Sequence, residues 1–234
     1  MTAPSHHLPE ALLVEYVAGT TAEPVSLAIA CHTTLCGGCQ IRVRELDRVA
    51  GAVLASTEPA AMAPDALQQM LARLDGDRAD HGGAASASAA APEAAPMSRE
   101  PPTGQASDPR LPRPLLRYLG EPSAWRWKRV VPGIYQMKIA SASREATARL
   151  VKLRPGAEIP LHSHAGAEYT VIFTGALEDG GMRYGRGDVA IRHAGERHDQ
   201  RVSAGETCIA LVVNHGDLIP LTWKGRILRL LDRT

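Results

Sequence analysis

The spacing of apolar residues divides the chain into two parts. Over residues 1–75 apolar side chains recur three and four positions apart, which is the period of an amphipathic helix. Helices are predicted to begin near Pro9 and Pro24, a third is marked by apolar residues over 43–54, and a fourth by those over 67–74, ending at Gly76. These segments predict a small helical bundle, whose limited core would benefit from a bound metal ion.

After residue 114 the apolar pattern becomes that of strands. Segments such as ARLVKL, YTVIF, DVAI and CIALVV are β-branched or apolar and are separated by Gly, Pro, Asp and Glu. Residues 76–114 between the two parts are rich in Ala, Pro, Ser and Gly and nearly free of large apolar side chains, so they predict a disordered linker. The expected fold is multidomain α and β: a helical bundle over 1–75, a linker over 76–114 and an all-β sandwich or barrel over 115–234.

Composition restricts the classes of function. The chain has 26 Lys and Arg against 25 Asp and Glu, so no net field would attract it to nucleic acid or to an anionic membrane. Its apolar runs are shorter than the roughly 20 residues of a membrane span, and the first residues lack the features of a signal peptide. We therefore expect a cytoplasmic protein. Four cysteines are too few for a disulfide framework, which leaves metal or redox chemistry for the two that lie close together.

The stretch CHTTLCGGCQ over residues 31–40 carries the first candidate site. His32 lies four residues before Cys36, and Cys39 three residues after it, so on a helix that the two intervening glycines loosen all three face one side. Tetrahedral zinc is held by four nitrogen or sulfur ligands, of which this segment supplies three. The fourth is expected from the adjacent His6 and His7, ahead of the first helix.

Other interpretations of these residues stay open. The CxxC pair alone would suit a thioredoxin-like redox site, although that motif occurs in a βαβ context and no such pattern is present here. His32 could be an ordinary helix histidine, and the N-terminal histidine pair could be solvated. Cys31, rotated away from His32, and Cys208, in an apolar strand, are predicted to be core residues.

A second candidate site lies in the β region, in GAEIPLHSHAGAEYTVIFTG. His162 and His164 share one face of a strand because side chains alternate with a period of two, and a hairpin partner strand would bring Glu168 alongside. His198, in the later stretch GDVAIRHAGERH, completes a set of three histidines and a carboxylate that suits Zn, Mn, Fe or Ni. His193 is either an additional ligand or a surface-loop residue.

Both segments resemble known families. A helical domain with HTTLCGGC and an upstream histidine is similar to the zinc-containing anti-sigma domain that binds extracytoplasmic-function (ECF) sigma factors, which implies His7 as the fourth ligand. The β region resembles the two cupin motifs. It matches the first at every motif position and departs from the second at His193, where proline is usual, and at Val202, where asparagine is usual.

Together the two halves resemble the ChrR class of anti-sigma factors. The resemblance implies a non-enzymatic protein that binds and inhibits an ECF sigma factor through a zinc-stabilised helical domain and makes no direct contact with nucleic acid or membrane. It also implies that the cupin metal, Zn with Mn or Fe as alternatives, serves in sensing singlet oxygen or oxidative stress. Self-association through the cupin is open. The alternatives are a dioxygenase-like cupin metalloenzyme with a helical accessory domain, and a zinc-dependent regulator of another partner.

Overall fold

The computed structural model describes residues 3–80, 110–141 and 143–223. For residues 75–80 it describes the backbone alone. The chain forms two compact units, one made of residues 1–52 and 105–234 and the other of residues 53–104. None of the helices within the described ranges is both long enough and apolar enough to cross a bilayer.

The helices predicted from the apolar period are present. They are α1 (Glu10–Val17), α2 (Glu23–Leu35), α3 (Gly37–Ala55) and α4 (Ala66–Asp80), followed by α5 (Arg113–Leu119) and a short 3₁₀ helix, η1 (Pro122–Ala124). The fourth helix therefore continues past Gly76, where we expected it to end. The ends of the predicted linker are helical, because residues 76–80 belong to α4 and residues 113–114 to α5, and its middle, 81–109, lies outside the described residues.

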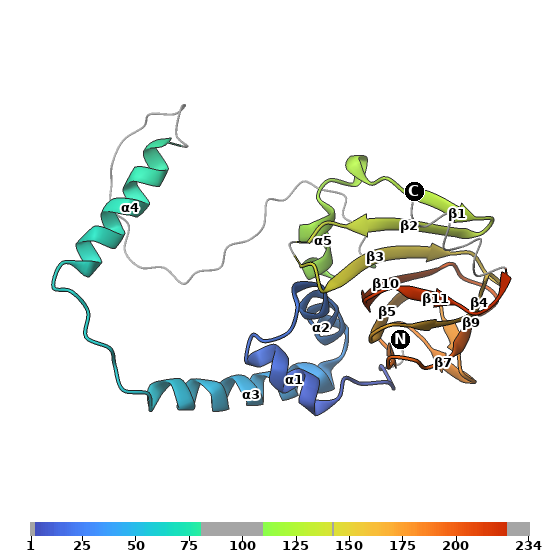
Figure 1. Cartoon of the computed structure of the whole chain (residues 1–234), viewed down its shortest axis with the longest axis horizontal. Coiled ribbons are helices and arrows are strands. Elements are labelled where there is room, and N and C mark those ends of the chain that lie inside the picture. Colours follow the sequence, from blue (N-terminus) through green and yellow to red (C-terminus); the bar gives the residue numbers. More distant parts are fainter. Residues whose placement is uncertain (1–2, 81–109, 142, 224–234) are drawn as a thin grey trace. The chain divides into compact units, whose positions relative to one another are not determined.

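The all-β prediction is confirmed by two antiparallel sheets that face each other (Figure 1). The six-stranded sheet has the order β1 (Lys128–Val131), β2 (Ile134–Ile139), β3 (Ala146–Leu153), β10 (Cys208–His215), β5 (Glu168–Thr174) and β8 (Val189–Arg192). The five-stranded sheet has the order β11 (Leu218–Pro220), β4 (Glu158–His164), β9 (His198–Val202), β6 (Leu177–Asp179) and β7 (Met182–Tyr184).

The six-stranded sheet is buried on both faces, as β10 illustrates. Cys208 and Ala210 belong to the core between the two sheets. Ile209, Leu211 and Val213 alternate with them and belong to a second core shared with the N-terminal helices. This arrangement explains why the segment CIALVV is apolar at every position, because a strand covered on one face only would alternate with polar residues.

The N-terminal helices complete their core against this sheet. Helix α2 packs against β3, β5 and β10 and against α5 (Figure 1). Its side chains Val25 and Ile29 are buried together with Leu13 of α1, Leu115 of α5 and Leu150 of β3. The small core that we expected among the helices is therefore shared with the β domain.

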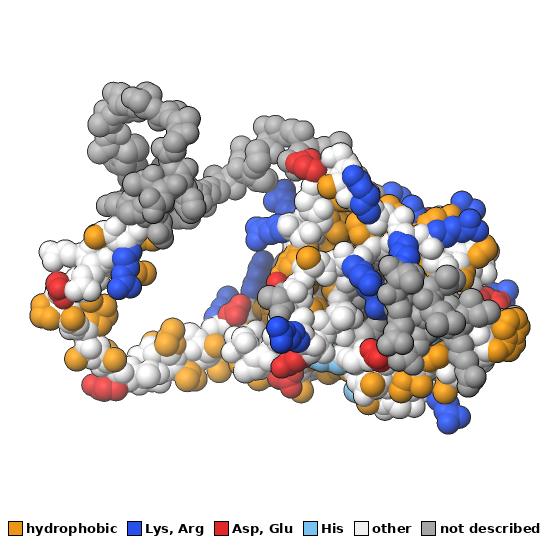
Figure 2. All heavy atoms as spheres, turned by 45° about the horizontal axis from the view of Figure 1, so that its top comes forward, with side chains coloured by type: hydrophobic (Ala, Val, Ile, Leu, Met, Phe, Trp, Pro, Cys, Tyr) orange, Lys and Arg blue, Asp and Glu red, His pale blue; other side chains and the backbone are white. Residues whose placement is uncertain are grey.

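The second half of α3 and the whole of α4 contribute little to that core. Val43 and Leu46 of α3 still pack against it. Farther along, large apolar side chains are half exposed or more on each of the two helices, namely Val49, Val53 and Leu54 on α3 and Leu67, Met70, Leu71 and Leu74 on α4. We call the four on α4 the exposed helical face. Figure 2 shows hydrophobic side chains at the surface of this part of the chain.

The shared core predicts a large effect of truncating Leu211, which is fully buried on the helical side of β10. Leu211→Ala should lower the free energy of unfolding by about 3 kcal/mol because it leaves a cavity between the sheet and the helices. Urea denaturation followed by circular dichroism measures the change. The matched control is Leu221→Ala, at a position that is 39% exposed, which should change stability little. Equal effects of the two substitutions would contradict the shared core.

Candidate metal centres

The first site forms where two helices meet. His32 lies in the last turn of α2, Cys36 follows that helix directly, and Cys39 lies in the first turn of α3. The expectation of one loosened helix through these residues was wrong. Cys36 has extended backbone angles, φ −110° and ψ 102°, so α2 ends at Leu35 and α3 starts anew at Gly37. The break directs both cysteines toward one point.

The structure brings four potential ligands together at this point. His7 Nδ1 lies 3.2 Å from Cys36 Sγ and 3.8 Å from Cys39 Sγ. With His32, the four ligand atoms all lie within 4.8 Å of one another. Tetrahedral zinc ligands at roughly 2.0–2.3 Å from the ion lie roughly 3.3–3.8 Å apart, so the cluster needs only small adjustments to enclose an ion.

His32 is oriented for ligation by its neighbours. Its Nδ1 lies 2.8 Å from the carbonyl oxygen of Gly187, to which it donates, while its buried Nε2 has no partner in the described part of the chain. Burial lowers the pKa of His32 to about 4, so its imidazole is neutral near pH 7. A metal-binding histidine is usually neutral, donates one ring N–H to a carbonyl or carboxylate oxygen and binds the metal with its other ring nitrogen. The unpartnered Nε2 of His32 is in the position of that second nitrogen.

Burial disfavours ionisation of the Cys39 thiol. Burial raises the pKa of Cys39, an effect that a hydrogen bond from the Leu8 backbone only partly offsets. Zinc would stabilise the thiolate form, which is the form that binds metal. Cys31 and Cys208 lie apart from both clusters as buried core residues, as predicted, and burial raises the pKa of each to about 12.

The two N-terminal histidines have different surroundings. His7 joins the cysteines, whereas His6 lies over Tyr184, with ring centroids 4.3 Å apart, and its Nδ1 is 3.5 Å from Asp188 Oδ2. Asp188 Oδ1 also accepts hydrogen bonds from the backbone amides of Ser5, at 2.7 Å, and His6, at 2.9 Å. The N-terminal segment is thereby fixed to the turn that precedes β8.

Gly187 in this turn has no room for a side chain. Its φ is +87°, in the region that favours glycine, and a Cβ atom there would lie 2.7 Å from Cγ of Pro4. Close approach of the N-terminal segment to the turn therefore depends on glycine at this position.

The second site lies between the two sheets. His162 and His164 come from the end of β4, and His198 begins β9, where it pairs with His162 in the strand register. Glu168 was expected on a hairpin partner of β4, and this was wrong. It begins β5, which pairs with β10 and β8 in the other sheet, so Glu168 faces the histidines from the opposite wall. The chain crosses between the sheets within residues 165–167.

The four side chains converge closely. His164 Nε2 lies 3.0 Å from His198 Nε2 and 3.3 Å from Glu168 Oε2, and all four ligand atoms lie within 4.8 Å of one another. Burial lowers the pKa of His162 to about 4 and that of His164 to about 3, and raises that of Glu168 to about 7. Imidazole nitrogens of His164 and His198 that face one another beside the carboxyl group of Glu168 fit a shared cation. His193 is exposed and lies outside the cluster.

Sequence reasoning missed the residues that support this site. Asp179 of β6 accepts from His198 Nδ1 at 3.0 Å and from Gln200 Nε2 at 3.0 Å, and it forms an ion pair with Arg192 at 2.7 Å. Burial alone would raise the pKa of Asp179, but these hydrogen bonds outweigh it and hold the pKa at about 2. Asp179 precedes two glycines, a common turn sequence, so nothing local distinguishes it as a support for a histidine.

Removing a thiolate ligand should empty the first site selectively. Cys36→Ser or Cys39→Ser is expected to reduce the metal content from about two equivalents per chain to about one, because the remaining ligands no longer complete a tetrahedral shell. Elemental analysis of the purified protein measures this. Cys31→Ala, at a buried position outside the cluster, is the control and should retain both ions. Retention of both ions by the two serine variants would exclude the proposed ligand set.

The carboxylate of Asp179 should affect metal binding at the second site and not at the first. Asp179→Asn is expected to weaken metal binding by the barrel about 10- to 100-fold, because His198 loses the negative partner that orients its ring. Competition with a chelator measures the affinity. Asp199→Asn, at an exposed position beside His198, is the control. An equal loss in both variants would mean that charge near the site, rather than the hydrogen bond, sets the affinity.

Comparison with known proteins agrees with this architecture. Residues 117–218 match the family described as the ChrR cupin-like domain. The chain is 32% identical over 214 residues to the anti-sigma-E factor ChrR of Cereibacter sphaeroides, covering 91% of each chain. It also aligns with a chain in the crystal structure of Rhodobacter sphaeroides SigE in complex with the anti-sigma ChrR, at 31% identity and a TM-score of 0.70, covering 89% of this chain and 98% of that one. The chain therefore belongs to the ChrR family of anti-sigma factors.

Proposed function

We propose that this chain is a cytoplasmic anti-sigma factor whose helical segment binds and inhibits an ECF sigma factor. In this proposal zinc at His7, His32, Cys36 and Cys39 holds the helical segment in its binding shape. A second metal in the cupin, Zn with Mn or Fe as alternatives, serves in sensing singlet oxygen or oxidative stress. The observation that carries the proposal is the match over 91% of the chain to a protein named as an anti-sigma-E factor.

The exposed helical face supports a protein partner. Its members are spaced i, i+3, i+4 and i+7, which places them on one side of α4: Leu67, Met70, Leu71 and Leu74. Apolar side chains gathered on one helix face are typical of a helix that binds in the groove of a partner. We assign the exposed helical face to the sigma factor.

A structural role for the first metal follows from what its ligands connect. His7 precedes α1, His32 lies in the last turn of α2 and Cys39 lies in the first turn of α3, so one ion would link these three helices. Short helices are marginal alone, and metal binding of this kind contributes directly to folding. Loss of the ion would remove the link that Cys39 makes between α3 and the two preceding helices.

A coupling between the two metal sites is supported by strand β8. The turn before β8 accepts the hydrogen bond of His32 through Gly187, and the last residue of β8, Arg192, forms the ion pair with Asp179 that supports His198. A shift of the barrel site could thereby alter the surroundings of the zinc site, as sensing requires. A regulatory role is favoured over the metalloenzyme alternative by the match to an anti-sigma factor along both halves of the chain.

Co-purification with an ECF sigma factor from the same cell tests the function. The wild-type protein should form a stable complex and inhibit transcription by RNA polymerase that carries this sigma factor. Cys36→Ser should abolish both effects, and Leu71→Glu should weaken binding by at least about tenfold because it introduces a charge into the exposed helical face. Leu221→Glu, on the barrel, is the matched control. If none of the ECF sigma factors of the cell is bound, the proposal is wrong.

The sensing role is tested by replacing barrel ligands. His164→Ala and Glu168→Gln should leave sigma binding and inhibition intact, because the exposed helical face is unchanged, yet prevent release of the sigma factor after illumination with a photosensitiser. A reporter gene under control of the sigma factor measures release. Normal release in both variants would remove the barrel metal from the response.

A further inference from the structure

The edge of the six-stranded sheet is left partly unpaired at β2. Strand β1 begins at Lys128, opposite Gln136, so it pairs only with the first half of β2. The second half, Met137 to Ile139, pairs with β3 on one side and with no described strand on the other. We call these three residues the β2 edge. Alternate residues of such an edge direct their N–H and C=O groups away from the sheet, where another strand can bind them.

A cavity of about 440 Å³ lies beside the β2 edge, within the size range of ligand pockets. Its lining comes from two segments of the chain: Tyr118, Leu119, Ala124, Arg126 and Lys128 from the first, and Gln136, Met137, Lys138 and Ala140 from the second. Among the described residues, the β2 edge forms backbone hydrogen bonds with β3 alone. Because the chain between α5 and β1 lines the cavity without pairing to β2, space for a further strand remains next to the edge.

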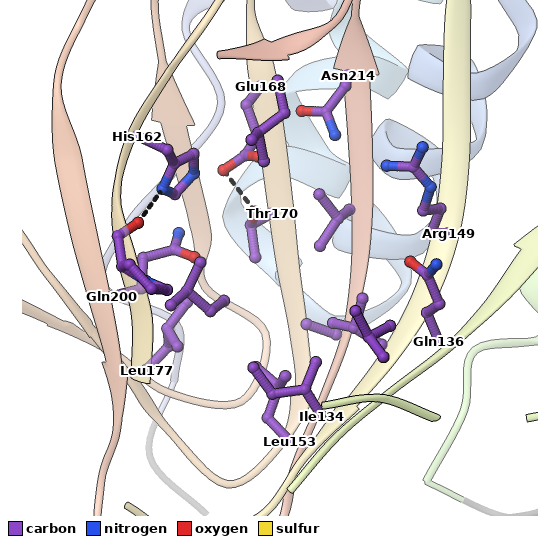
Figure 3. Close-up of a pocket in the computed structure, with 17 residues that line it drawn as sticks. Ile134, Gln136, Arg149, Leu153, His162, Glu168, Thr170, Leu177, Gln200 and Asn214 are labelled. Carbon is purple, nitrogen blue, oxygen red and sulfur yellow. Dashed lines mark hydrogen bonds between the residues drawn. The ribbon is translucent and has the colours of Figure 1, made fainter. Parts of the chain in front are cut away.

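The two faces of the β2 edge differ in chemistry. Gln136 projects into the barrel (Figure 3), and because side chains alternate along a strand, Lys138 belongs to the same face of the sheet. Met137 belongs to the opposite face, where it and Leu119 of α5 pack against the core that the helices share with the sheet. A strand added at this edge would therefore meet a cation on one face and apolar side chains on the other.

The surroundings of the β2 edge are strongly basic, which the near balance of charge over the whole chain conceals. Residues 110–154 include eleven Lys and Arg but only two Asp and Glu. Three of these cations line the cavity: Arg126, Lys128 and Lys138. Arg126 donates to main-chain carbonyl oxygens, and neither it nor Lys138 forms an ion pair with another residue that the structure describes. An acidic partner is complementary to this charge.

We propose that the β2 edge binds an extended acidic segment of a second protein, which joins the six-stranded sheet as an additional strand. The main chain of the segment pairs with β2, its acidic side chains lie on the face of Lys138, and its apolar side chains lie beside Met137 and Leu119. The recognised chemistry is an alternation of Asp or Glu with apolar residues. The β2 edge and α4 belong to different compact units, and the inference goes beyond the proposed function without depending on it.

Fluorescence anisotropy of the full-length, metal-loaded protein with a labelled peptide, Glu-Val-Glu-Val-Glu-Val-Glu, tests the proposal without a sigma factor. We expect saturable binding at one site per chain, which weakens as added salt screens the charges. The same peptide with Lys in place of Glu should not bind. A peptide of equal composition, with its Glu residues grouped before its Val residues, should bind at least about tenfold more weakly because the alternation is lost.

Charge reversal at the cavity should weaken binding, because a repulsion replaces an attraction. Lys138→Glu and Arg126→Glu, both at exposed positions, should each weaken binding of the alternating peptide about tenfold. Arg183→Glu, the same change at an exposed position of β7 in the other sheet, is the matched control and should bind like the wild type. Equal losses in all three variants would mean that net charge alone attracts the peptide, and would overturn the proposal.

Hydrogen exchange followed by mass spectrometry tests the strand pairing itself. The bound peptide should slow exchange of the backbone amides over residues 137–140 and leave exchange in β7 unchanged. Peptide binding without this protection would show that no strand is added at the β2 edge.

Three further outcomes would also overturn the proposal. The first is the absence of saturable binding of the alternating peptide. The second is an oligothymidylate of about 12 nucleotides that competes with the peptide and binds more tightly, which would assign the surface to nucleic acid. The third is protection of residues 137–140 that increases with protein concentration in the absence of peptide, which would assign the β2 edge to a second copy of this chain.

Discussion

Burial of both faces of the six-stranded sheet is the constraint on which the other features depend. One face closes the barrel around the second metal cluster, and the other supports α1, α2 and α5. Neither the helices nor the sheet could be removed without exposing the apolar side chains of the other, because residues such as Ile209 and Leu211 have their partners across that boundary. The helical and β segments are consequently one folding unit up to residue 52.

The same arrangement places strand β8 between the surroundings of the two metal clusters. Strand β8 contains only Val189 to Arg192, yet the turn before it receives His32 and its last residue holds Asp179. Backbone hydrogen bonds between this turn and Ile172 of β5 fix the turn to the sheet that carries Glu168. Strand β8 therefore connects the surroundings of the two sites through hydrogen bonds and one ion pair.

Local pattern predicted most residues of each cluster, and the family resemblance implied His7 rather than His6, but neither predicted how the backbone positions them. Spacings of two, three and four residues identified His162 with His164 and His32 with both cysteines, because helices and strands have fixed periods. The break of α2 at Leu35 and the crossing between sheets before Glu168 were not predictable from such periods, since tertiary packing decides them. The support of His198 by Asp179 and the contact of Gly187 with His32 were not predicted for a related reason, because the partners lie far apart in the sequence.

The turn at Gly187 has a consequence for how this protein can diverge in evolution. Three of its hydrogen bonds to the N-terminal half have a main-chain atom as one partner, either the carbonyl oxygen of Gly187 or the amides of Ser5 and His6, and the side chain of His32 or Asp188 as the other. Main-chain groups are the same whatever side chain a residue carries, so pairwise co-variation across this boundary would be weak even though the contact is close. Conservation of a glycine followed by an aspartate would be the principal trace that the connection leaves in related sequences.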